Sequence, residues 1–138
     1  MTKEKVTAFA ARAEPFAYAA LRIVAGAMFA LHGVQKIFDW PTPGHSQPIA
    51  SQLGIGGLIE LGCGVLIALG LFARPAAFLA SGTMAVAYFQ FHWKLSFAQL
   101  QWLPSINQGE LAALYCFVFL VIATRGAGIA SLDKRSGL

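Results

Sequence analysis

The sequence predicts an all-α integral membrane protein, a bundle of four transmembrane helices arranged as two helical hairpins. Hydrophobic residues make up 57% of the 138 residues and charged residues only 12%. Soluble domains usually contain about 25% charged residues, so this chain lacks much of the charge that keeps a protein in water. Four stretches reach the roughly 20 mostly apolar residues that a helix needs to cross a bilayer. They cover about residues 15–37, 53–72, 75–93 and 107–124.

The segment before the first span, residues 1–14, is expected to be a cytoplasmic or interfacial helix, because its apolar residues fall near one helical face. It does not resemble a signal peptide, since the apolar stretch behind it is too long and carries Arg22. Pro15 and Pro75 suit the first turns of the first and third spans.

The connections between the spans predict the two hairpins. A polar, proline-containing loop joins the first two spans, and a tight turn around Arg74 joins the second to the third. The last connection carries Trp93 and Trp102, which suit the interfacial aromatic belt of a membrane protein.

Positive charge is unevenly distributed between the two predicted sides of the bundle. The two longer loops offer only Lys36 and Lys94, whereas the other side collects seven basic residues. The positive-inside rule therefore places both termini, including the tail 126–138, in the cytoplasm. The basic residues on that side are Lys3, Lys5, Arg12, Arg74, Arg125, Lys134 and Arg135.

Several binding chemistries find no support in the sequence. The net charge of +4 is not gathered into a basic patch with aromatics, so no nucleic-acid partner is predicted. Cys63 and Cys116 lie far apart without a CxxC motif, which favours small core residues in helix packing over a redox pair. No metal is predicted, because zinc held by His32, His92 and a glutamate would lack motif spacing.

Ionisable residues inside the apolar spans are the candidate functional residues, because such groups usually face the bundle interior. A rise of about 1.5 Å per residue places most of them in the outer half of the bundle. The preferred pairs are Glu60 with His32 or Lys36, and Glu110 with His92. Candidates for ligand binding or proton handling are His32, Lys36, Glu60, His92, Asn107 and Glu110.

Each candidate also has a structural interpretation. Glu60 would be a polar clamp between helices, Glu110 a solvated carboxylate at a helix start, and the two histidines simple hydrogen-bonding groups. Lys36 would extend to the outer headgroups. Arg22, nearer the inner side, would reach a lipid headgroup or form an interior ion pair.

A faint internal repeat relates the two hairpins, with a glutamate in the second and fourth spans and a histidine in the first and third. Coincidence in apolar sequence is the alternative. Two histidines at similar depth could ligate a haem. However, a glycine adjoins only His32, which argues against haem.

Several stretches resemble the DoxX family: residues 21–26 and 29–38, with Arg22, His32-Gly33 and Lys36, followed by residues 57–64, 70–76 and 107–112. The resemblance covers about residues 16–133. It implies a small four-span protein of the bacterial inner membrane. Named family members are linked to quinone-coupled sulfur oxidation and to membrane oxidoreductase complexes. The resemblance supplies no accepted catalytic residues.

The predicted function is that of an accessory or quinone-interacting subunit of a membrane oxidoreductase system. Its partners would be the lipid bilayer and other redox subunits, and a homo-oligomer is left open. His32 and Glu60 would hydrogen-bond a quinone headgroup, Glu110 and His92 would form a second wall, and Lys36 would tune their charge. No soluble-enzyme motif occurs, so catalysis would need a borrowed cofactor or partner.

Two other functions are weighed against this one. A non-catalytic scaffold would use the polar layer only to fix helix register. A small proton-coupled transporter would resemble four-span exporters, but those carry a carboxylate in the first helix, where this chain has Arg22 and His32.

Overall fold

The computed structural model describes residues 2–136, and no strand occurs among them, so the all-α prediction is confirmed. Four helices form the body of the molecule. They are α1 (Lys3–Phe38), α2 (Gln52–Leu69), α3 (Ala73–Ala87) and α5 (Glu110–Arg125). The short elements are the π-helix η1 (Tyr88–Trp93), the 3₁₀ turn η2 (Ala98–Leu100), α4 (Pro104–Asn107) and α6 (Leu132–Ser136).

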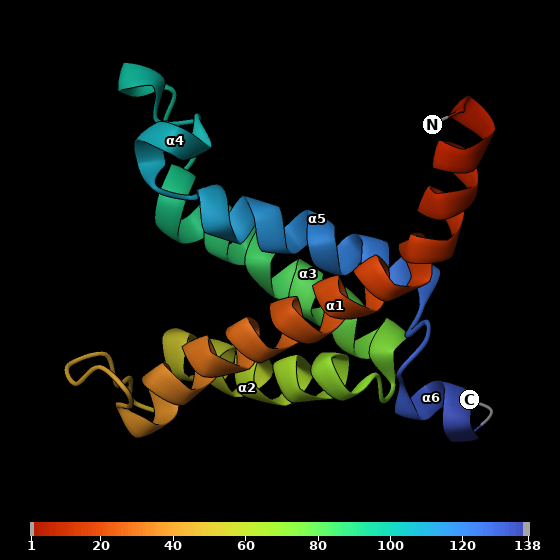
Figure 1. Cartoon of the computed structure of the whole chain (residues 1–138). Helices are drawn as coiled ribbons and strands as arrows, with labels where there is room; N and C mark the ends of the chain where they lie inside the picture. The colour runs from red at the N-terminus through yellow and green to blue at the C-terminus, as the bar shows by residue number, and fades with distance from the viewer. Residues whose placement is uncertain (1, 137–138) are drawn as a thin grey trace.

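The four long helices form two pairs, α1 with α2 and α3 with α5, and α2 and α3 join the pairs (Figure 1). Both chain termini and the turn between α2 and α3 lie at one end, which we call the termini end. The connections 39–51 and 94–109 lie at the opposite end, which we call the loop end. The predicted succession of two helical hairpins is therefore present.

Two helices, α1 and α2, are long and apolar enough to cross a membrane. The helix α3 has 15 residues but continues directly into the 6 residues of η1, because Tyr88 keeps right-handed helical geometry. The helix α5 begins three residues later than the predicted fourth span. The cause is Gln108, whose φ of 59° ends α4 in the left-handed region.

The helix α1 joins the predicted N-terminal segment and the first span into one element of 36 residues, with Pro15 inside it. A proline within a helix removes one backbone hydrogen bond and bends the axis. In Figure 1 the first turns of α1 lean away from the rest of the bundle.

Close packing of α1 on α2 depends on glycines. A Cβ atom added to Gly64 would lie 2.4 Å from the backbone nitrogen of Ala30. One added to Gly26 would lie 2.6 Å from the backbone nitrogen of Ala68. No side chain fits in these gaps, so the two backbones touch directly.

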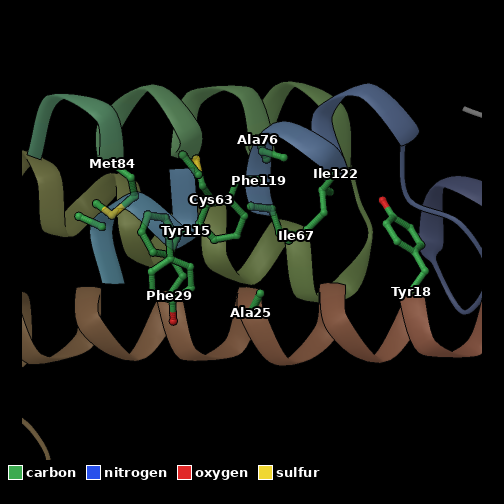
Figure 2. Close-up of a cluster of buried hydrophobic side chains, with 13 residues drawn as sticks. Tyr18, Ala25, Phe29, Cys63, Ile67, Ala76, Met84, Tyr115, Phe119 and Ile122 are labelled. Carbon is green, nitrogen blue, oxygen red and sulfur yellow. The ribbon is translucent and has the colours of Figure 1, made fainter. Parts of the chain in front are cut away.

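The core between the helix pairs is aromatic and aliphatic (Figure 2). Phe29 of α1 lies 4.7 Å from Phe119 and 5.4 Å from Tyr115, both of α5, measured between ring centroids. Ile67 and Ile122 complete the cluster without any exposure to solvent. These rings connect α1 to α5, whose backbones otherwise make few contacts.

Candidate functional site

A cavity of about 230 Å³ lies near the loop end, between α1, α2, the α3–η1 helix and α5. Four of the predicted candidates line it. Two further polar residues, Gln108 and Tyr115, complete its wall. Its polar lining residues are His32, Lys36, Glu60, His92, Gln108 and Tyr115.

An ion pair forms one side of this polar cavity. The Nζ atom of Lys36 donates to Oε1 of Glu60 at 2.5 Å and so connects α1 to α2. The Glu60 side chain is 4% exposed and that of Lys36 is 29% exposed. Of the two partners predicted for Glu60, the structure therefore selects Lys36. The ammonium group compensates a carboxylate that would otherwise be buried alone.

Two residues that line the cavity each carry a buried polar atom without a hydrogen-bond partner within residues 2–136: Oε2 of Glu60 and the hydroxyl of Tyr115. More than about 90% of buried polar groups in proteins are hydrogen-bonded, so each exception calls for an explanation. An acceptor on α2 and a hydroxyl on α5 are therefore left without a partner in two residues that line the same cavity.

His92 is held by its surroundings. It lies in the π-helix η1, a helix type that is rare and often found at functional sites. Its Nδ1 contacts the carbonyl oxygen of Asn107 at 3.2 Å, which assigns the Nδ1 atom as the donor. In a neutral ring the other nitrogen, Nε2, is then an acceptor.

Asn107 has a different place from the one predicted. Its side chain donates to the Gln101 carbonyl at 2.8 Å and accepts from the Gly109 backbone at 2.7 Å. It does not line the cavity but orders the loop whose backbone contacts His92. Its influence on the cavity is therefore indirect.

The predicted pair of Glu110 with His92 is wrong among the described residues. Glu110 is exposed in the first turn of α5, does not line the cavity, and forms no ion pair with any described residue. An acidic side chain in a helical first turn is favoured by the helix dipole, which accounts for its position without a partner.

Sequence reasoning missed Tyr115 and Gln108. Tyr115 is 6% exposed, and its ring lies 6.2 Å from that of His32 in edge-to-face geometry. The signal was a lone tyrosine in the apolar run of α5, one helical turn before Phe119 of the core.

The family comparison places this chain among known proteins. The DoxX family matches residues 17–93, which is more than half of the chain. The chain belongs to the DoxX family. An uncharacterized protein of Haemophilus influenzae is 40% identical over 124 residues, covering 88% of this chain and 91% of that protein. No solved structure matches.

The match of the DoxX family contains four of the six polar cavity residues, from His32 to His92, and ends before Gln108 and Tyr115. The relative from Haemophilus influenzae carries no stated activity, so family membership assigns no ligand to the cavity.

The contacts of Arg22 in this DoxX protein differ from the predicted ones, which were a lipid headgroup or an interior ion pair. Its side chain has no exposure, and its guanidinium donates to the carbonyls of Ala127 and Ala130 at 2.8 and 2.7 Å. Its Nε has no partner among the described residues. The planar fork of donors suits two converging backbone carbonyls. Arg22 therefore fastens the segment after α5 to α1.

Cys63 and Cys116 are free thiols, and Cys63 belongs to the apolar core. Within residues 2–136, no three His, Cys, Asp or Glu side chains come close enough to hold a metal ion.

Proposed function

We propose that this DoxX protein is a quinone-interacting subunit of a membrane oxidoreductase system and that the polar cavity receives the quinone headgroup. The observation that carries the proposal is the pair of unpartnered buried atoms, Glu60 Oε2 and the Tyr115 hydroxyl, in two residues that line one cavity. A ligand with two oxygen atoms would give both atoms a hydrogen bond.

The chemistry of a quinone fits these residues. A quinone presents two carbonyl oxygens that accept hydrogen bonds, and the quinol presents two hydroxyls that also donate. The Tyr115 hydroxyl would donate to a carbonyl, and Glu60 Oε2 would accept from a quinol hydroxyl. The volume of about 230 Å³ is below the roughly 300–1,000 Å³ of pockets for drug-sized ligands, so the cavity suits a headgroup alone.

The remaining polar residues suit proton handling. Lys36 compensates the Glu60 charge, and the Asn107 contact leaves His92 Nε2 as an acceptor in the neutral ring. Proton acceptance by these side chains is the contribution of this chain. The transfer of electrons is assigned to a partner subunit.

The proposal includes a four-span topology in the bacterial inner membrane with both termini in the cytoplasm. By themselves, α1 and α2 satisfy the length and hydropathy requirements of a membrane-spanning helix. The α3–η1 helix and α5 lie beside them, with exposed apolar side chains such as Phe78, Leu114 and Phe117. The termini end carries Arg74, Arg125 and most other basic residues, as the positive-inside rule expects of a cytoplasmic face.

Binding of the tail-less headgroup, dimethoxy-methyl-benzoquinone, to the protein in detergent micelles tests the proposal. Glu60→Gln keeps the side-chain shape but removes the charged acceptor. Hydrogen bonds to charged groups contribute about 1.5–3 kcal/mol, so the Kd for the reduced headgroup should rise about tenfold to a hundredfold. Glu110→Gln is the matched control, because that carboxylate lies at the same end but outside the cavity, and it should leave the Kd unchanged.

Tyr115→Phe separates a ligand contact from a structural one. Removing a buried hydroxyl that has no partner should leave the ligand-free protein equally stable or more stable. The same change should weaken binding of the oxidised headgroup about fivefold, since a neutral hydrogen bond contributes about 1 kcal/mol. Unchanged binding in both Tyr115→Phe and Glu60→Gln, with folded protein, would refute the quinone site.

A scaffold subunit is the second candidate function, and the Lys36–Glu60 ion pair favours it because it connects α1 and α2. In that case Glu60→Gln would reduce assembly with partner subunits and would not change headgroup binding. Copurification of partners from membranes that carry each variant distinguishes the two functions.

A further inference from the structure

We infer that an apolar groove between α2 and α3 holds the hydrocarbon tail of the molecule whose headgroup occupies the polar cavity. The inference rests on the proposed function and adds that the ligand is an amphiphile with a long tail, which enters from the lipid between these two helices.

The groove has a volume of about 430 Å³ and is nearly all apolar. Residues of α2 form one wall, and residues of α3 and η1 form the other. Phe78 is 67% exposed and Leu79 50% exposed, so the rim opens outward rather than into the protein core. For a helix pair in a bilayer, this opening faces lipid.

The groove adjoins the polar cavity. Four residues line both spaces: Lys36, Glu60, Met84 and Ala87. The ion pair therefore lies at the meeting point of an apolar groove and a polar chamber, which is where the junction between head and tail of an amphiphile would lie. Met84 has a flexible, unbranched side chain that adapts to a passing chain, and Ala87 is small.

Two glycines keep the groove open. Gly56 of α2 and Gly82 of α3 both line it, and a Cβ atom added at either would meet no atom within 4 Å. These glycines are therefore not needed for close helix contact, unlike Gly64. At the loop end, Gln52 of α2 donates to Gln90 of η1 and bridges the two walls. A tail would thus extend from the ion pair toward Phe78 and Leu79.

The test compares two probes on the same protein in lipid nanodiscs: decylubiquinone, which has a tail, and the tail-less dimethoxy-methyl-benzoquinone. Gly82→Leu and Gly56→Leu place a side chain in the groove. Gly62→Leu is the matched control, because Gly62 also lies on α2 with open space around it but outside the groove. Thermal unfolding of each variant checks that it folds.

We expect either groove variant to raise the Kd of decylubiquinone by about tenfold or more, a loss of about 1.4 kcal/mol. The Kd of the tail-less probe should be unchanged, and Gly62→Leu should affect neither probe. A decylubiquinone analogue with a diazirine at the tail end should label the peptide that contains Phe78 and Leu79.

Three other results would overturn the inference. If both groove variants bind decylubiquinone like the wild type, the tail lies elsewhere, while the headgroup proposal stands. If the wild type binds neither probe, the proposed function fails and the tail site fails with it. If Gly82→Leu converts a wild-type dimer to a monomer with unchanged quinone binding, a second copy of the chain fills the groove.

Discussion

The ammonium group of Lys36 and the carboxylate of Glu60 form a 2.5 Å ion pair that is buried on the glutamate side and partly open on the lysine side. This asymmetry predicts unequal effects of removing each partner. Lys36→Met leaves a buried carboxylate uncompensated and should lower the free energy of unfolding by about 3–5 kcal/mol. Glu60→Gln should destabilise less, because the free ammonium can extend toward water.

The double variant Lys36→Met/Glu60→Gln should recover much of the stability lost in Lys36→Met. The measurement is a double-mutant cycle of unfolding in mixed micelles, followed by tryptophan fluorescence. Neighbouring residues in one network show coupling energies of about 0.5–3 kcal/mol. Strictly additive effects would show that the two groups do not depend on each other.

The gathering of His32, Lys36, Glu60 and His92 in one layer could be predicted from the sequence, because each is an ionisable group in the outer half of a predicted span. The position of Glu110 outside the cavity could not be predicted in this way. The faint repeat related Glu110 to Glu60, but a repeated sequence motif does not determine which side of its helix faces the cavity. The helix α5 begins at Glu110 only after a separate turn, α4, and turns Ala112 and Tyr115 toward the cavity instead.

Arg22 shows a second limit of sequence reasoning. Burial of an arginine in an apolar span predicted a charged partner, either acidic or a lipid. Its partners are backbone carbonyls of residues 127 and 130, more than a hundred positions away. Backbone acceptors leave no trace in side-chain patterns, because every residue has a carbonyl.

Replacing Arg22 by lysine should loosen the segment that follows α5. A lysine keeps the charge but lacks the planar fork that serves the Ala127 and Ala130 carbonyls together. One lost charge-assisted hydrogen bond corresponds to about 1.5–3 kcal/mol. Amide hydrogen exchange of residues 127–133 should accelerate accordingly. Arg12→Lys, at an exposed position of α1, is the control. Equal exchange in Arg22→Lys and wild type would show that the carbonyl contacts contribute nothing.

Two glycines of α2, Gly64 and Gly62, should respond to substitution by alanine with opposite changes in stability. Gly64→Ala should destabilise the protein by about 1–3 kcal/mol, because its Cβ would overlap the Ala30 backbone of α1. Gly62→Ala, at an open position of the same helix, should stabilise it by about 0.5–1 kcal/mol through helix propensity. Unfolding of both variants in mixed micelles is the measurement. Similar effects at the two positions would mean that α1 and α2 do not touch at Gly64.

The loop after α1 should respond to pH through Asp39. Backbone N–H groups of Gly44, His45 and Ser46 donate to its carboxylate and lower the pKa of Asp39 below its ordinary value of 3.8. Hydrogen bonds to the charged form favour that form. A lowered pKa means that the loop stabilisation is fully present above the ordinary value. It is lost as the pH falls through the lower pKa of the folded state.

Hydrogen exchange of the His45 and Ser46 amides measures this effect. Protection in the wild type should stay constant above about pH 4 and decrease below it, as Asp39 becomes protonated. Asp39→Asn removes the titrating group, so its protection should be lower at neutral pH and should not change across the same range. If the variant loses protection at the same pH as the wild type, another group controls the loop. The Asp39 contacts would then not be what holds the turn between α1 and α2.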